Sequence, residues 1–292
     1  RSSVLSRSNI SLALDLGKVR IAIPVMLSGL TGYLAGAESI HAAGWWVMLG
    51  VLLLSMGASA LNQIQERKFD ARMPRTMRRP LPSGQLKLAQ AWMVTLVLIL
   101  AGSLVLLYGA GMTSMLLGLM TILWYNGIYT YLKRITAFAV VPGSVVGALP
   151  PLIGWAATGL PLWTESSVSL AFFFFIGQIP HFWLIILMIG PQYEQAGYPS
   201  LSAIFSQRQI SNLTLIWAVS SGITALILPL FGVIRLPYLQ WLLLLPVAWI
   251  IYVFMRTVKT GLSEATARRG FLYINLFFLF VMMLVIADAL IR

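Results

Sequence analysis

Apolar stretches alternate with short polar segments along almost the whole chain. A helix needs about 20 consecutive, mostly apolar residues to cross a bilayer. By that measure the pattern predicts about nine membrane-spanning helices. Their expected ranges are 19–37, 44–65, 88–108, 112–131, 138–156, 168–189, 210–231, 237–257 and 271–290. We therefore expect an all-α polytopic membrane protein, in which residues 1–292 form a single transmembrane domain with a short basic tail over residues 1–18.

Composition supports this prediction. Of the 292 residues, 59% are hydrophobic and 10% are charged, whereas a soluble domain carries about 25% charged residues. The mean hydropathy is +0.87. The absence of cysteine excludes a disulfide framework and a thiolate metal site. The net charge of +12 would suggest nucleic acid in a soluble protein. In a membrane protein basic residues set the topology, so we expect lipid contacts and no nucleic-acid partner.

The basic residues fall on alternate sides of the expected helices. The N-terminal segment and the even-numbered loops hold all Lys and Arg except Arg235 and Arg292. The positive-inside rule then places the N-terminus in the cytoplasm and the C-terminus outside. The first residues, RSSVLSRSN, contain Arg and Ser without acids, as a transit peptide does, but the stretch is short. We expect an integral protein of a bacterial inner (plasma) membrane rather than of a mitochondrial inner membrane.

The charged segment LNQIQERKFDARMPRTMRRPLPSG, residues 61–84, interrupts the apolar pattern. Within it Asn62, Glu66 and Asp70 are spaced by four residues, so on a helix they share one face. Oxygen ligands beside Arg and Lys suit a magnesium ion that bridges to phosphates. The basic neighbours would bind the remaining phosphate oxygens. This arrangement would stabilise a departing diphosphate.

An alternative explanation of the segment is purely local. Asp70 could pair with Lys68 or Arg67 at the end of a helix, with little effect on stability. The spacing alone leaves the metal site and the local ion pair both open.

Sequence motifs extend the interpretation beyond spacing. The run from Asn62 to Asp70 resembles NxxxDxxxD, the first aspartate-rich motif of the UbiA superfamily of intramembrane prenyltransferases. Met73, Arg75, Thr76, Arg79 and Gly84 are similar to the MxRTxxRxLxxG run of one of its families, the protoheme IX farnesyltransferases or heme O synthases. Further segments resemble that family in the same order: YTYLKR (129–134), GALPPLIGWAATG (147–159), QIPHF (178–182) and ARRGFLYINLFFLF (267–280). The resemblance runs from about Ala22 to Asp288 and implies a nine-helix bundle with the N-terminus inside.

Two departures from the family pattern concern the acidic motifs. Glu66 stands where the family has Asp. The family's second motif reads roughly RxKDYxxAGxPML, and the aligned run here is IGPQYEQAGYPSL, residues 189–201. Gln192 replaces the family's Asp, Tyr193 is kept, and Glu194 comes two positions later. On a regular helix Glu194 would point about 200° away from position 192, so the second acidic motif is degraded.

The resemblance implies the transfer of a farnesyl group from farnesyl diphosphate to a vinyl group of heme b, which gives heme O and diphosphate with Mg²⁺ as cofactor. It implies that Asn62, Glu66 and Asp70 hold Mg²⁺. The residues expected at the diphosphate or the heme propionates are Arg67, Arg75, Arg79, Lys133 and Arg134. Respiratory oxidase assembly components are expected partners. Two alternatives stay open: a different aromatic or tetrapyrrole acceptor, and a catalytically degenerate homologue that binds heme or an isoprenoid.

His181 lies in an otherwise apolar expected helix, directly after Pro180. A histidine inside the bilayer is a functional candidate, and heme iron accepts imidazole. An interhelical hydrogen bond, with Gln178 nearby, is the alternative. Upstream, Pro150 and Pro151 are expected to break their helix, which membranes tolerate where the backbone lines a cavity.

Overall fold

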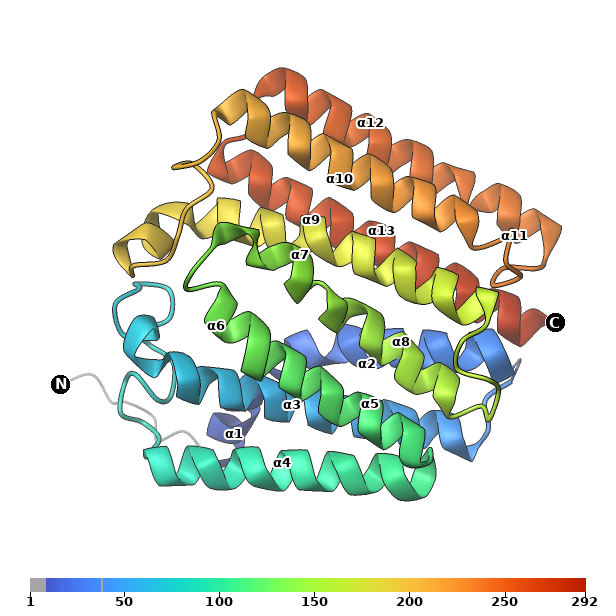
Figure 1. Cartoon of the computed structure of the whole chain (residues 1–292), viewed down its shortest axis with the longest axis horizontal. Coiled ribbons are helices and arrows are strands. Elements are labelled where there is room, and N and C mark those ends of the chain that lie inside the picture. The colour runs from blue at the N-terminus through green and yellow to red at the C-terminus, as the bar shows by residue number, and fades with distance from the viewer. Residues whose placement is uncertain (1–8, 38) are drawn as a thin grey trace.

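The computed structural model describes residues 9–37 and 39–292, and all regular structure in this part of the chain is helical. Figure 1 shows the long helices side by side along one direction, with the C-terminus at one end of the bundle. The elements are α1 (Asn9–Gly17), α2 (Val19–Ala37), α3 (Ala42–Asp70), α4 (Leu88–Gly109), α5 (Met112–Ile122), η1 (Leu123–Tyr129), α6 (Thr130–Leu132), η2 (Ala137–Ala139), α7 (Val140–Gly143), α8 (Val145–Ala156), α9 (Glu165–Gln195), α10 (Gln207–Ile227), α11 (Pro237–Leu242), α12 (Leu244–Thr260) and α13 (Glu264–Ile291).

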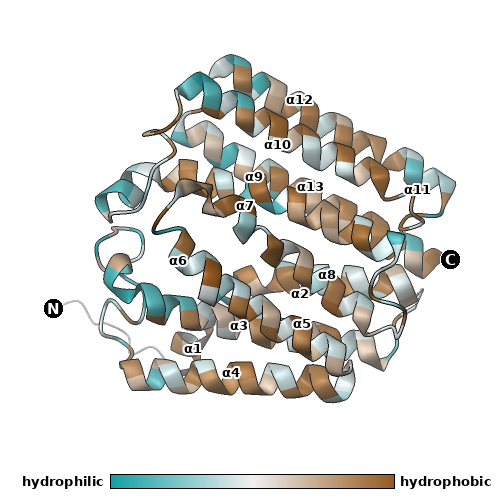
Figure 2. Ribbon diagram, viewed as in Figure 1, coloured by the Kyte–Doolittle hydropathy of each residue, from teal (hydrophilic) through white to brown (hydrophobic). Residues whose placement is uncertain are grey.

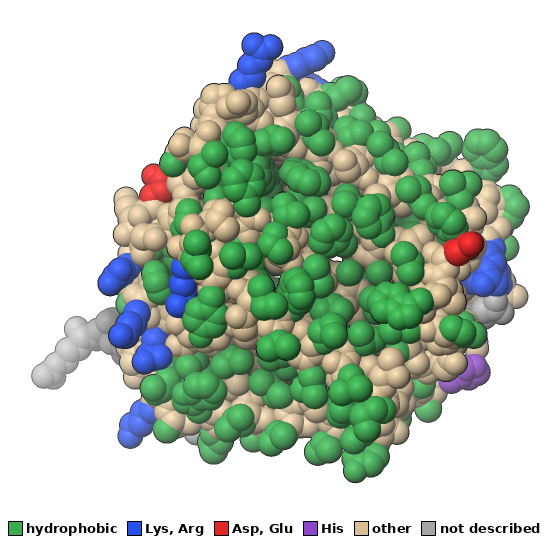
Figure 3. Space-filling view, viewed as in Figure 1, with side chains coloured by type: hydrophobic (Ala, Val, Ile, Leu, Met, Phe, Trp, Pro, Cys, Tyr) green, Lys and Arg blue, Asp and Glu red, His purple; other side chains and the backbone are tan. Residues whose placement is uncertain are grey.

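The prediction of an all-α membrane protein is confirmed. Eight helices of the described part are long and apolar enough to cross a membrane. Residues 112–131, expected as a further span, form three consecutive pieces, α5, the π-helix η1 and α6. Hydrophobic residues dominate the middle of the long helices and hydrophilic residues gather at their ends (Figure 2). Hydrophobic side chains cover most of the face in Figure 3, with Lys and Arg at its margins.

Several helices extend beyond the apolar ranges that predicted them. Helix α3 ends at Asp70 rather than at residue 65, and α9 ends at Gln195 rather than at residue 189. The hydropathy pattern ends where the chain leaves the apolar layer, but the backbone hydrogen bonds continue into the polar layer. This extension places Glu66 and Asp70 on a regular helix. Residues 9–17, within the expected tail, form α1.

Helices α2 and α8 pack in direct backbone contact. A Cβ atom on Gly32 would overlap the carbonyl oxygen of Pro151, and one on Gly154 would overlap that of Gly29. Small residues permit such close approach in membrane proteins. The expected break at Pro150–Pro151 is wrong, because α8 continues through both prolines. The interruption lies upstream at Ser144.

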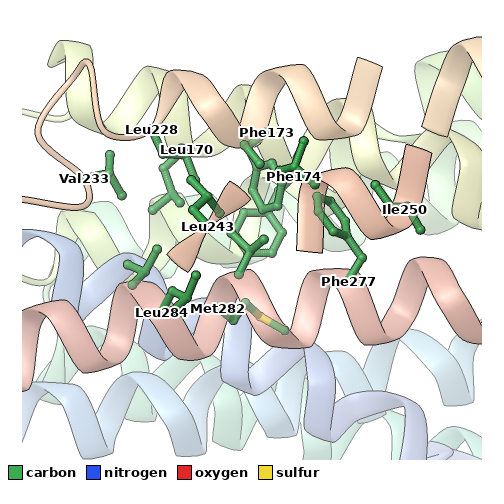
Figure 4. Close-up of a cluster of buried hydrophobic side chains, with 14 of the residues drawn as sticks. Leu170, Phe173, Phe174, Leu228, Val233, Leu243, Ile250, Phe277, Met282 and Leu284 are labelled. Atoms are coloured by element: carbon green, nitrogen blue, oxygen red, sulfur yellow. The ribbon is translucent and has the colours of Figure 1, made fainter. Parts of the chain in front are cut away.

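The largest apolar core lies among α9, α10, α12 and α13 (Figure 4). Phe173 and Phe174 of α9 are buried there, and Phe173 stacks against Phe278 of α13 at 4.7 Å between ring centroids. Phe172, in the same run of four phenylalanines, is 47% exposed on the outer surface. This core packs α9 against α13 and thereby positions the polar pair between these helices, His181 and Asn275.

Candidate active site

Asn62, Glu66 and Asp70 lie on one face of α3, near its C-terminal end, and we call them the α3 triad. All three are buried, with exposed fractions of 2%, 6% and 2%. Their spacing of four residues keeps them on the side of α3 that faces the bundle. The polar end of the bundle, at the left of Figure 1, thus contains two buried carboxyl groups.

Glu66 has two partners from distant parts of the chain. Its Oε1 accepts a hydrogen bond of 2.8 Å from the Tyr198 hydroxyl and lies 2.7 Å from Lys133 Nζ. Burial and the facing carboxylate raise the pKa of Tyr198, so its hydroxyl stays neutral and donates. Burial disfavours the Lys133 ammonium, but Tyr193 and Glu66 outweigh it and raise the pKa of Lys133 well above its ordinary value. Lys133 therefore stays charged beside Glu66.

Asp70 pairs with Arg79, at 2.7 Å between Oδ2 and Nη1, rather than with Lys68 or Arg67. The loop after α3 folds back onto the helix end, where the Thr76 hydroxyl donates a 2.8 Å hydrogen bond to the Asp70 carbonyl. Asp70 therefore does not form the local ion pair with Lys68 or Arg67 that the spacing alone had allowed. Both carboxylates of the triad instead face cations from other segments.

Arg75 lies on the same loop. Burial and then the neighbouring Arg79 lower the pKa of Arg75, whereas Tyr193 and Asp70 act in the opposite direction. These interactions place the Arg75 guanidinium in the electrostatic environment of the triad.

Lys18 is a member of this site that sequence reasoning missed, because it was counted only as a topological charge. It forms the turn between α1 and α2 with φ of 50°, in the left-handed region. Gln63 of α3 anchors that turn by donating a 2.7 Å hydrogen bond to the Leu16 carbonyl. Desolvation and the nearby Arg79 lower the pKa of Lys18 to about 7, against the effects of Asp70 and Glu66. We call Lys18, Arg75, Arg79 and Lys133 the basic cluster.

Two expected basic residues make their contacts elsewhere. Arg67 donates to the Ile64 carbonyl of its own helix. Arg134 lies over the rings of Phe69 and Tyr131, each at 4.9 Å. It also donates to the backbone of α3. The structure thus brings Arg75, Arg79 and Lys133 toward the triad, and binds Arg67 and Arg134 to other groups.

The π-helix η1 shapes the wall opposite α3. Its Asn126 donates hydrogen bonds to the Ala58 carbonyl and to the Gln65 side chain, at 3.0 and 3.1 Å. The wider turn of a π-helix changes which residues face the neighbouring helix, and such turns are frequent at functional sites. One turn further, Thr130 accepts a 3.1 Å hydrogen bond from the Asn62 amide nitrogen, which leaves the amide oxygen for another partner. The periodicity of the sequence did not predict the π-helix η1.

The second-motif residues divide between two sides of α9. Tyr193 stacks on Tyr198 at 4.4 Å, next to Glu66. Gln192 has a buried Oε1 without a hydrogen-bond partner. Glu194 points away and accepts a 2.8 Å hydrogen bond from Ser202. Together with Tyr193 it lines a cavity of about 340 Å³. The predicted direction of Glu194 on a regular helix is therefore the one observed.

His181 lies deeper in the bundle. It forms an interhelical hydrogen bond, which was the alternative to a heme contact, but the partner is Asn275 of α13, with 3.0 Å between Nδ1 and Oδ1, rather than Gln178. Gln178 packs against Gly147 of α8. Beside His181, Phe182 stacks on Tyr129 at 4.9 Å, and Lys133 Nζ lies 5.6 Å from the Tyr129 ring. A continuous row of aromatic rings therefore leads from His181 to the basic cluster.

The donor set of the triad fits one divalent ion. Two carboxylates and one amide oxygen are the hard ligands that Mg²⁺ prefers, with phosphate oxygens or water completing its shell. In the described residues, no group of three or more His, Cys, Asp or Glu side chains could hold a metal ion. A buried site with two carboxylates, a basic cluster and an aromatic row suits chemistry on an anionic, apolar substrate.

Comparison with known proteins agrees with this chemistry. The chain belongs to the UbiA prenyltransferase family, whose sequence profile matches residues 23–285. It is therefore an integral membrane enzyme, a prenyltransferase. The chain is 34% identical to the protoheme IX farnesyltransferase of Oleidesulfovibrio alaskensis, with 96% of each chain covered. It is 37% identical to the protoheme IX farnesyltransferase of Geobacter sulfurreducens, over 80% of this chain and 88% of that one.

Solved structures share the fold at low sequence identity. A UbiA homologue from Aeropyrum pernix K1 superimposes with a TM-score of 0.74 at 17% identity, over 92% of this chain and 98% of that one. A UbiA homologue from Archaeoglobus fulgidus bound to GPP and Mg²⁺ gives a TM-score of 0.62 at 12% identity, over 95% and 100%. These similarities establish the helical arrangement.

Proposed function

We propose that this chain transfers the farnesyl group of farnesyl diphosphate to a vinyl group of heme b, giving heme O and diphosphate. The observation that carries the proposal is the α3 triad, whose two buried carboxylates face the basic cluster at the entrance to an aromatic row. Relatives that share at least a third of their residues with this chain are protoheme IX farnesyltransferases. A heme substrate and a farnesyl donor follow from those names.

The diphosphate end of the substrate would lie between the triad and the basic cluster. Asn62, Glu66 and Asp70 would hold Mg²⁺, which when bound offsets the negative charge of the leaving diphosphate. Lys133 and Arg79 would exchange their present carboxylate partners for phosphate oxygens. As the C1–O bond breaks, its electron pair leaves with the diphosphate, and these cations stabilise the developing charge.

The aromatic row would receive the farnesyl chain. Breaking the C1–O bond leaves an allylic cation, and the Tyr129 and Phe182 rings offer faces that stabilise a nearby positive charge. The vinyl π electrons of the acceptor then form the new carbon–carbon bond. Water adds to the resulting cation and loses a proton, which gives the hydroxyl group. Until the vinyl group attacks, the closed helical bundle keeps water from the first cation.

His181 would orient the acceptor. The Asn275 amide nitrogen donates to the Phe271 carbonyl at 2.7 Å, so its oxygen accepts from His181 Nδ1. The Nε2 lone pair is then available to heme iron. We expect His181→Ala to shift the Soret band of bound heme. The Asn275→Ala variant, in which His181 remains but loses its orienting partner, should give a smaller shift. An unchanged spectrum in both variants would contradict this role.

A product assay tests the function. Detergent-purified protein is incubated with heme b, farnesyl diphosphate and Mg²⁺, and heme O is sought by mass spectrometry, with and without EDTA. We expect heme O that disappears with EDTA. No heme O from protein that still binds heme, with a related enzyme active alongside, would contradict the proposal. The neutral Gln192 favours one alternative, a degenerate homologue, which would bind heme without releasing diphosphate from the donor.

We also propose a bacterial plasma membrane with the site at the cytoplasmic face, and respiratory oxidase assembly components as partners. The support is the clustering of basic residues at the end of the bundle that carries the site, at the left of Figure 3. A reporter fused after Arg292 should be active outside the cytoplasm. Reporter activity only in the cytoplasm would overturn the proposed orientation of the chain in the membrane.

A further inference from the structure

Few negative groups surround the site. The triad supplies two carboxylates, and other acids of the described part are placed elsewhere. Asp15 is exposed on α1, Glu165 begins α9, Glu194 accepts from Ser202, Glu264 lies 3.4 Å from Arg268, and Asp288 lies 3.0 Å from Arg292. Glu66 and Asp70 are therefore the buried carboxylates of the site.

Gln192 lies on a buried side of α9, which packs at Ala196 against Met73 of the loop after α3. Ile189 and Ala196, three residues before and four after it, are 6% and 0% exposed. Next to it, the Tyr193 ring contacts Tyr198, whose hydroxyl reaches Glu66. Gln192 Oε1 is buried and has no hydrogen-bond partner. An unsatisfied buried oxygen is unfavourable without a ligand or water. A neutral amide can supply that contact but no negative charge.

Charge balance then limits how many divalent ions the site can hold. One Mg²⁺ offsets the charges of Glu66 and Asp70 and completes its shell with phosphate oxygens. The basic cluster remains to offset the diphosphate. A second divalent ion would find no buried carboxylate of its own and would be repelled by Arg75, Arg79 and Lys133 of the cluster.

We propose that this chain binds its prenyl diphosphate with a single divalent ion held by the α3 triad, and that the basic cluster supplies the positive charge of a second ion. The amide of Gln192, where a carboxylate would bind that second ion, excludes it. This inference rests on the proposed prenyl transfer only for the identity of the diphosphate as the ligand.

The test counts metal ions directly. The full chain in detergent is dialysed to equilibrium with Mn²⁺ and with a farnesyl diphosphate analogue in which sulfur replaces the C1–O oxygen. Bound Mn²⁺, read by electron paramagnetic resonance, is divided by bound analogue. We expect a ratio of one for the native chain and a ratio of two for Gln192→Asp. Gln192→Asn, which matches Asp in shape without its charge, should stay at one.

Further variants probe the other ligands. Glu194→Gln should stay at one, because Glu194 faces Ser202. Lys18→Ala should weaken analogue binding about tenfold at an unchanged ratio, as expected for the loss of one charge-assisted contact. Lys68→Ala, on the exposed side of α3, should bind as the native chain does.

The outcomes separate this proposal from the proposed function. A ratio of two in the native chain, a ratio of one in Gln192→Asp, or no binding of the analogue would overturn the single-ion proposal. A ratio of one with no heme O in the product assay would overturn the heme acceptor and leave the single-ion site standing. Heme O formation with two bound ions would overturn the single-ion proposal and leave the heme acceptor standing.

Discussion

Both ends of the bundle contain buried carboxylates, but the partners of these carboxylates differ in kind. At the end of α13, Asp288 is fully buried, and its Oδ1 accepts from the backbone N–H groups of Arg235 and Leu236, at 2.8 and 2.7 Å. Arg292 Nε lies 3.0 Å from Oδ2. The carboxylate thereby attaches the loop before α11 to α13. Its backbone partners belong to the fold and have no freedom to exchange.

At the opposite end, the partners of Glu66 and Asp70 are the side chains of Lys133, Tyr198 and Arg79. Long side chains can turn toward a bound anion without any movement of the backbone. The comparison indicates that a buried carboxylate bonded to backbone donors stabilises the fold. A buried carboxylate that is paired with flexible Lys or Arg side chains can instead bind a ligand.

The largest expected effect is a loss of activity when a carboxylate at the site end of the bundle is neutralised. Asp70→Asn keeps the size of the side chain but removes the charge that would hold Mg²⁺, so heme O formation should fall about 10³-fold. The melting temperature should change little. Initial rates by mass spectrometry and thermal unfolding in detergent measure both. Activity within a few fold of the native chain would remove the metal role of Asp70, and Lys68→Ala is the matched control.

The second prediction concerns the other end. Asp288→Ala removes a buried acceptor from the part-buried backbone N–H groups of Arg235 and Leu236 and should reduce the free energy of unfolding by about 3 kcal/mol. Activity per folded molecule should be retained. Asp288→Asn keeps an acceptor oxygen for these donors and should lose less. A large loss of activity without a loss of stability would mean that Asp288 is not the structural counterpart of the triad.

The third prediction tests the region between the two ends. Gly32→Ala forces a methyl group against the Pro151 carbonyl and should reduce the free energy of unfolding by about 2 kcal/mol. Gly190→Ala is the control, because a Cβ there meets no atom within 4 Å. Thermal unfolding of both proteins gives the answer. Equal stability would show that α2 and α8 can separate without disturbing the bundle.

The smallest expected effect is a pH dependence at the site. Desolvation and Arg79 depress the pKa of Lys18 to about 7 from 10.5, so the folded chain loses this proton as the pH rises through about 7. Affinity for the diphosphate analogue should then fall by up to about tenfold. The free energy of unfolding should rise between these two pKa values, because the unfolded chain still binds the proton.

The matched variant is Lys18→Arg, since arginine keeps its charge throughout this range. Its affinity for the analogue should be nearly independent of pH from 6 to 9. Parallel profiles for the native chain and the variant would show that another group titrates.

Several features of this protein were predictable from sequence. The apolar stretches predicted the membrane-spanning helices because burial in lipid requires a run of suitable length, and each run is local. The spacing of Asn62, Glu66 and Asp70 predicted their shared face for a similar reason, since helix periodicity relates residues four apart. The direction of Glu194 on a regular helix followed from the same geometry.

Tertiary structure decided which groups meet the triad. The partners of Glu66 come from the segment directly after α6 and from the loop after α9, and Lys18 comes from a left-handed turn before α2. His181 found Asn275, which lies 94 positions away along the chain. The charge and hydropathy patterns of a sequence predict single helices but not which side chains of different helices meet. These contacts depend on how α3, α9 and α13 pack together, because only packing brings side chains from distant segments within bonding distance.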